Sequence, residues 1–200
     1  MMHIRRFFLT IAVLFFVSLI SGETTAAEYR LGLKVNHTTV DASLERIGAV
    51  RRGNVCIGVV GTYKDTDYWT AGGKVSMTSN QLHPDFQYGV GFKGLGGNVE
   101  QDHRDEDLAL MAFTVDLSYD IPPAVNPIPL PIDLYAGVSM APKPLCFSDG
   151  KTYGDFRLGT GWYIMENAII FAEYRYTEFR FEDVRSVYDN IALIGYSVRF

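Results

Sequence analysis

The chain has 200 residues, 48% of them hydrophobic, and a formal net charge of −5, so it is long enough for one domain of ordinary size. Its acidic balance argues against nucleic-acid binding, which requires a basic surface that contacts phosphates. We therefore expect no nucleic-acid partner.

The first 27 residues have the pattern of a secretory signal. Arg5 and Arg6 precede an apolar run over 7–20, and the small and polar residues SGETTAA follow it. A membrane anchor is the alternative, but the run is shorter than the roughly 20 apolar residues that a spanning helix needs. We therefore expect a signal peptide over 1–27, cleaved after Ala27, and a single domain over 28–200.

The rest of the chain alternates apolar and polar residues and shows almost no helical spacing. This period of two predicts β-strands separated by turn-rich stretches. Ten strands are favoured, and eight is the alternative if the first two candidates do not form separate strands. The candidates are 29–36, 40–47, 54–64, 69–79, 86–98, 107–120, 131–142, 153–165, 168–179 and 190–200.

Most of these segments have one apolar face, rimmed by aromatic residues, and one face of glycine, serine and charge. In 190–200, for example, Ile194, Tyr196, Val198 and Phe200 share the apolar face. A soluble β-sandwich also alternates in this way. The length of the strands and the aromatic residues near their ends favour a bilayer span instead, and a sheet in lipid must close on itself. We predict an all-β fold: a single antiparallel transmembrane β-barrel.

The end of the chain has an alternating pattern of its own. The terminal strand has Tyr196, Val198 and Phe200 at alternate positions. This pattern resembles the last strand of bacterial outer-membrane barrels, which the barrel-assembly machinery recognises. We expect the outer membrane of a Gram-negative bacterium as the location. The expected partners are outer-membrane lipid, lipopolysaccharide and the barrel-assembly machinery, and the oligomeric state stays open.

The connections between strands should alternate between the two sides of the membrane, with short turns inside and longer polar loops outside. Counting back from an internal C-terminus, 99–107, 142–151 and 180–189 fall outside, and 166–167 forms a short internal turn. The proline-rich stretch 121–131 also falls inside although it is long, so we expect an extended linker there.

Cys56 and Cys146 are predicted to lie at opposite levels of this barrel. A hydrocarbon core of roughly 30 Å would separate them, whereas a disulfide needs Cα atoms within about 7 Å. We expect no bond between them.

Alternation also predicts which charges point into the lumen. Seven basic and five acidic groups are close to balance, so in a barrel of 8 strands they would pair and plug the interior, whereas 10 strands leave room for a narrow water path. The predicted lumen charges are Arg30, Lys34, Lys74, Lys93, Arg157, Arg175 and Arg199 with Glu45, Asp116, Asp133, Asp155 and Glu173.

The loop 101–107 is the one stretch with the residue types of a metal or catalytic site. Asp102, His103 and Asp105 could supply ligands to a divalent cation, or an Asp–His pair could activate water. All of these groups lie on one loop, and no second catalytic group is recognisable on neighbouring strands. A solvated acidic loop explains them more simply, so we expect no enzyme, no catalytic residue and no cofactor.

The downstream half of the chain has a recognisable series of motifs. Residues 133–176 contain an aromatic-glycine strand, an SDG loop, glycines before Trp162 and an EYRY strand, and AGGKV lies at 71–75 and FKGLG at 92–96. These motifs resemble the YfaZ-like family of Gram-negative outer-membrane proteins. The resemblance implies a barrel in the outer membrane and brings no catalytic motif with it.

Three functions are compatible with this reading of the sequence. The favoured one is a structural barrel or a small, weakly selective pore. A surface-binding or membrane-integrity protein that acts through its external loops is the alternative, followed by a hydrolase with its site at the barrel rim.

Overall fold

The computed structural model describes residues 28–200 except 66, 102–103, 123–125, 127–130 and 182–185, so the expected signal peptide lies outside the described residues. The described part of the chain forms ten strands and a short 3-10 helix, η1. No helix within it is long and apolar enough to cross a membrane. The elements are β1 (Glu28–Val35), β2 (Thr39–Val50), β3 (Gly53–Lys64), β4 (Tyr68–His83), β5 (Phe86–Gln101), β6 (Arg104–Asp120), β7 (Ile132–Ala141), η1 (Lys143–Leu145), β8 (Gly150–Met165), β9 (Ala168–Phe181) and β10 (Val187–Arg199).

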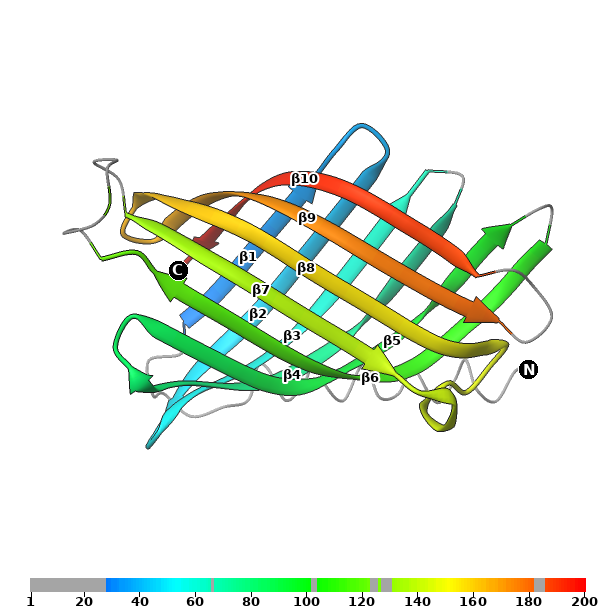
Figure 1. Cartoon of the computed structure of the whole chain (residues 1–200), viewed down its shortest axis with the longest axis horizontal. Helices are drawn as coiled ribbons and strands as arrows, with labels where there is room; N and C mark the ends of the chain where they lie inside the picture. The colour runs from blue at the N-terminus through cyan, green and yellow to red at the C-terminus, as the bar shows by residue number, and fades with distance from the viewer. Residues whose placement is uncertain (1–27, 66, 102–103, 123–125, 127–130, 182–185) are drawn as a thin grey trace.

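These strands form one closed antiparallel barrel in which each strand pairs with its neighbours in sequence (Figure 1). β1 pairs with β10 from Arg30 opposite Arg199 to Val35 opposite Ile194, which closes the sheet. The predicted ten-stranded barrel is confirmed. The eight-stranded alternative is wrong, because β1 and β2 are separate strands joined by a tight turn at 36–38.

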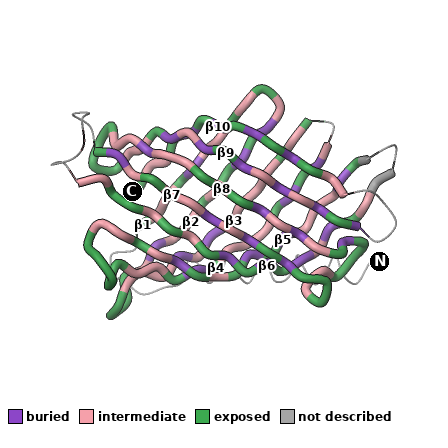
Figure 2. The backbone as a smooth tube through the Cα atoms, viewed as in Figure 1, coloured by how far each residue is buried: buried purple, intermediate pink, exposed green. Residues whose placement is uncertain are grey.

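Inward and outward residues alternate along the strands, as Figure 2 shows by the alternation of buried and exposed positions. The outward positions keep large apolar side chains: Leu158 is 52% exposed, Val90 57% and Ile194 66%. A closed barrel can bury only its inward face, so a broad apolar band remains on the outside.

Two predicted external loops are largely strand. β5 continues to Gln101 and β6 begins at Arg104, so most of 99–107 belongs to a hairpin. Similarly, β9 ends at Phe181 and β10 begins at Val187, so the loop is shorter than the predicted 180–189. Polar residues on a strand that continues past the apolar band look like loop residues in the sequence, which explains both errors.

The end of β10 pairs as the alternation predicts, although the strand itself finishes at Arg199. The backbone N–H of Phe200 donates to the carbonyl of Tyr29 (2.9 Å), and the N–H of Tyr29 donates to the carbonyl of Phe200 (2.8 Å). The two rings stack with centroids 6.0 Å apart. Backbone hydrogen bonds and this ring contact thus join β1 and the end of the chain as far as Phe200.

The barrel has two distinguishable ends. We call the end where β10 finishes the C-terminal end; β2, β4, β6 and β8 also finish there, at the left of Figure 1. β5, β7 and β9 finish at the opposite end, which we call the far end.

Candidate functional site

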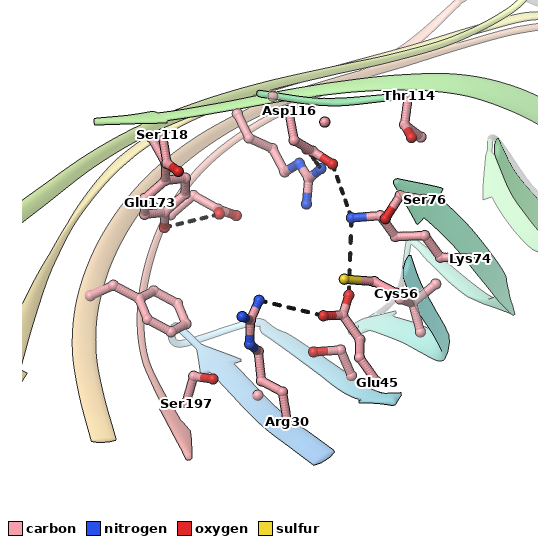
Figure 3. A pocket seen from close by; sticks show the side chains of 18 of the residues that line it. Arg30, Glu45, Cys56, Lys74, Ser76, Thr114, Asp116, Ser118, Glu173 and Ser197 are labelled. Atoms are coloured by element: carbon pink, nitrogen blue, oxygen red, sulfur yellow. Dashed lines mark hydrogen bonds and ion pairs between the residues drawn. The ribbon is translucent and has the colours of Figure 1, made fainter. Parts of the chain in front are cut away.

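The lumen contains a cavity of about 530 Å³ that extends to the turns of the C-terminal end, where Asp85 and Glu166 line it. Figure 3 shows side chains from around the wall pointing into this common space. Every predicted lumen charge contributes to the lining, namely Arg30, Lys34, Glu45, Lys74, Lys93, Asp116, Asp133, Asp155, Arg157, Glu173, Arg175 and Arg199.

Asp155 on β8 is the centre of the deepest charged group. Its carboxylate forms ion pairs with Arg175 Nε at 3.2 Å and Arg157 Nε at 3.4 Å, and Lys93 Nζ lies at 4.0 Å. Thr177 Oγ1 donates to the same carboxylate at 3.2 Å. Asp155 is only 3% exposed. A charge buried this deeply is tolerated because several opposite charges and hydrogen bonds surround it.

From Asp155 the ion pairs continue around the lumen with alternating sign. Arg157 Nη2 donates to Asp116 at 2.9 Å, and Lys74 Nζ donates to the other oxygen of Asp116 at 3.0 Å. Lys74 also lies 4.0 Å from Glu45, which is 3.6 Å from Arg30. Strands β8, β6, β4, β2 and β1 are thereby connected through their inward side chains (Figure 3). We call this network, from Asp155 to Arg30, the charged belt.

Two further groups complete the belt on the β9 side. Arg175 Nη1 donates to Asp41 at 2.9 Å across the barrel. Lys34 Nζ donates to Glu173 at 2.7 Å, and the hydroxyl of Tyr135 donates to the same carboxylate oxygen at 3.1 Å. These bonds connect β9 with β2, β1 and β7.

Glycines on the inner wall make room for these long side chains. A Cβ atom on Gly137 would lie 2.7 Å from Asp116 Oδ1 and 3.1 Å from Arg157 Nη2. A side chain at this position would therefore displace the Asp116–Arg157 ion pair. The glycine at position 137 of the aromatic-glycine strand is therefore explained by the space that this ion pair needs.

Beyond the belt, the far end of the lumen is filled by apolar side chains. The rings of Tyr68 and Phe179 lie 5.3 Å apart and those of Tyr153 and Phe179 5.4 Å apart. Their neighbours are almost inaccessible to solvent: Val99 is 0% exposed and Leu110 3%. We call this group the apolar plug; it consists of Tyr68, Leu95, Val99, Leu108, Leu110, Ala112, Ala141, Tyr153, Phe179 and Phe181.

A buried hydrogen-bonded group ties the plug to the far rim. Asp189 on β10 accepts from Lys64 Nζ at 2.8 Å and from the hydroxyl of Tyr68 at 2.8 Å. Asp189 is 3% exposed. These contacts connect β10 to β3 and β4 beyond the end of the shorter β1.

Further charged residues of the lumen were not predicted from the sequence, among them Asp41, Lys64 and Asp189. Asp41 has the same parity as Glu45 on β2, so alternation alone could have found it. Lys64 likewise shares the inward parity of Cys56 on β3. Asp189 fell in a predicted loop, and only the extra length of β10 places it on the inner wall.

The remaining predicted residues lie apart from the belt. Asp133 and Arg199 line the cavity towards the C-terminal end, and Asp133 is directly opposite Asp120 on β6. Tyr196 and Phe200 are outward and exposed, 46% and 70% respectively, and Val198 is half-buried.

The predicted metal loop is only partly visible. Asp102 and His103 lie outside the described residues, and the Asp105 side chain does too, although its backbone belongs to β6. Within the described part of the chain, no group of three or more His, Cys, Asp or Glu residues is arranged to hold a metal ion.

Both cysteines are free. Cys56 lines the cavity, whereas Cys146 lies in the β7–β8 connection at the far end. Burial raises the pKa of the Cys146 thiol.

No protein-family model matches the chain, and no curated protein matches its sequence. Solved structures of similar fold include the outer membrane channel DcaP of Acinetobacter baumannii, which is 12% identical, with 86% of this chain and 62% of that chain covered and a TM-score of 0.44. A loop-deletion mutant of OmpT, an outer membrane protein of Vibrio cholerae, is 14% identical over 90% of this chain and 61% of that one, with a TM-score of 0.40. The NanC porin is 12% identical over 87% and 98%, with a TM-score of 0.39. At such low identities and TM-scores these likenesses carry no argument about function.

Proposed function

We propose that this chain is an outer-membrane β-barrel of a Gram-negative bacterium that does not conduct solutes. Its lumen is a blind polar cavity, open at the C-terminal end and closed by the apolar plug at the far end. The favoured role is therefore structural or ligand-binding.

The outer surface supports the membrane location. Large apolar side chains such as Met77, Val90 and Leu158 are 58%, 57% and 52% exposed, and they continue around the barrel. An apolar surface this continuous is unusual for a soluble monomer, whereas a closed barrel is one of the two structures that can satisfy its backbone in lipid. The C-terminal end would then face the periplasm, as in other barrels with short turns on that side.

The plug is the observation that carries the closure. An open pore needs a continuous polar path, whereas the inward side chains of Val99, Leu110 and Phe179 at the far end are 0%, 3% and 2% exposed and belong to one packed cluster. Below them the belt charges are paired with each other, and so they do not form a ring of one sign that would select ions. A small pore of low selectivity remains the alternative function.

A non-enzymatic role is part of the same proposal. The carboxylates of the charged belt, such as Asp155 and Asp116, are engaged by arginine or lysine, which makes them poor general bases. We also propose that the chain belongs to the YfaZ-like family and that the barrel-assembly machinery recognises its terminal strand through Tyr196, Val198 and Phe200.

The second candidate function is binding of lipopolysaccharide by the external loops.

Two measurements test the proposal. The outer-membrane fraction should contain the protein, and its electrophoretic mobility should change between unboiled and boiled samples, because closed barrels resist detergent until heated. Liposomes that contain the purified protein should not swell in an isosmotic solution of a small sugar. A soluble periplasmic protein without a mobility shift would contradict the membrane location, and swelling at the rate of a porin control would contradict the closure.

A further inference from the structure

The wall of the barrel is incomplete between β6 and β8 at the far end. β7 pairs with β6 only from Phe113 to Asp120, so the part of β6 before Phe113 has no strand on that side. β8 begins at Gly150 and does not fill the space. Residues 142–149, which we call the strap, lie there instead, with η1 at their start.

The strap is attached to β6 by a few hydrogen bonds, several of them from side chains. The N–H of Phe147 donates to the carbonyl of Ala109 at 2.7 Å, and the N–H of Ala109 donates to Ser148 Oγ at 2.9 Å. Ser148 Oγ in turn donates to the carbonyl of Asp107 at 2.5 Å, and the N–H of Asp107 donates to Asp149 Oδ2 at 3.1 Å. Ser148 and Asp149 thus take the place of a missing strand.

The other edge of the same β6 segment is held quite differently. There it pairs with β5 in an unbroken register from Phe86 opposite Tyr119 to Gln101 opposite Arg104. The seam with the strap is therefore the weaker of the two, because it has fewer backbone hydrogen bonds and its residues Ser148 and Asp149 are exposed.

The strap separates two apolar regions. On its inner side Leu145 and Cys146 pack against the apolar plug, and Cys146 pairs with Leu110 in an antiparallel bridge. On its outer side Phe147 is 60% exposed, as is the outward-facing Met140 at the end of β7. Displacement of the strap would join the plug to the apolar band on the outside of the barrel.

We propose that the strap is a lateral gate through which an acyl chain of the surrounding lipid reaches the apolar plug. Opening requires the loss of the hydrogen bonds to Asp107 and Ala109, while the β5–β6 ladder stays closed. On the inner side of the plug, Lys93 Nζ donates to the hydroxyl of Tyr153 at 3.0 Å, and both residues line the polar cavity. The gate rests on the proposed membrane location but not on the absence of conductance.

A disulfide across the seam provides the decisive variant. Directly opposed residues of an antiparallel pair have Cα atoms about 4.5–5.5 Å apart, which a disulfide can bridge. Leu110→Cys in a Cys56→Ser background therefore creates one pair, with the native Cys146, that oxidation closes and reductant reopens. The reduced form of the same protein is the matched control, and the mobility shift on boiling verifies the barrel.

The probe is a phosphatidylcholine with a diazirine on its acyl chain, in nanodiscs that contain the variant. In the reduced form we expect photolabelling of the inward residues Leu108 and Phe181 as well as the outward Phe113. Oxidation should lower the inward labelling at least about tenfold and leave Phe113 unchanged, because a covalent seam cannot open. Inward labelling that is absent in the reduced form, or that survives oxidation, would overturn the gate.

Hydrogen exchange tests the opening without any lipid chain. Ser148→Ala removes the acceptor of the Ala109 N–H, so the amides of Ala109 and Phe147 should exchange about tenfold faster. The amides of β5 opposite should not change. Equal exchange in the variant and the wild type would contradict a releasable strap. If the barrel were found outside the outer membrane, both the proposed location and the entry of a lipid acyl chain would be refuted. The exchange measurement would still show whether the strap opens.

Discussion

The two halves of the lumen are built by the same strands but filled by opposite means. Towards the far end, Phe179 and its neighbours exclude water by packing, which needs no matched partners. Towards the C-terminal end, Asp155, Asp116 and Glu173 each pair with cations from other strands. The same barrel therefore packs apolar side chains at one end and lines a polar cavity at the other.

This difference has an energetic consequence. A smaller apolar side chain loses contacts and leaves a cavity that its neighbours can partly fill by relaxing. A buried ion network relaxes less easily, because removal of one member leaves the others buried and unpaired. We therefore expect the belt to be more sensitive to single substitutions than the plug.

The largest loss should follow Asp155→Asn. The amide has the same shape but no charge, so Arg157 and Arg175 lose the carboxylate between them. The free energy of unfolding in urea should fall by about 3–5 kcal/mol. Glu166→Gln, in the exposed β8–β9 turn, is the control and should change little. Equal stability of the Asp155 variant and the wild type would show that the belt is not a coupled network.

A smaller loss, of about 3 kcal/mol, is expected for Phe179→Ala, because the ring contacts Tyr68 and Tyr153 inside the plug. Urea unfolding followed by tryptophan fluorescence measures it. Leu82→Ala, at a position 74% exposed on the C-terminal rim, serves as the control. If the two variants were equally stable, Phe179 would not be part of a packed plug.

The smallest effect is predicted for Glu45→Gln at the more accessible end of the belt. Glu45 lies 3.6 Å from Arg30, whose side chain is 35% exposed, and 4.0 Å from Lys74. Such a pair contributes roughly 0–1 kcal/mol to the free energy of unfolding, and high salt should reduce the difference between the variant and the wild type further. Urea unfolding of both proteins at low and at high salt measures the loss and its salt dependence. A loss of stability as large as that of Asp155→Asn would mean that depth in the lumen does not determine how much a charge contributes to stability.

The strands and their inward faces could be predicted because a sheet with one apolar face imposes a period of two. Lys93, Arg157 and Arg175 were assigned to the lumen on this basis alone, and all three line the cavity. Strand ends were harder, since Asp189 and Glu100 are polar residues on strands that continue beyond the apolar band.

The partners of each charge could not be read from the sequence. Arg175 contacts Asp41 and Asp155, but this depends on which strands face each other across the barrel, which the stagger of the strands determines. The plug was also missed, because 108–112 is apolar on both faces and its alternation carries no signal. A segment that is apolar on both faces lacks the alternation by which the other strands were recognised.

The single-channel conductance of the purified wild-type protein in a planar lipid bilayer tests the central claim most directly. The protein should insert without producing current steps, because the apolar plug interrupts any path for ions through the lumen. Inserted barrels are counted independently by their heat-dependent mobility after recovery. Steady, reproducible steps in proportion to the inserted protein would contradict a closed lumen and restore the small pore.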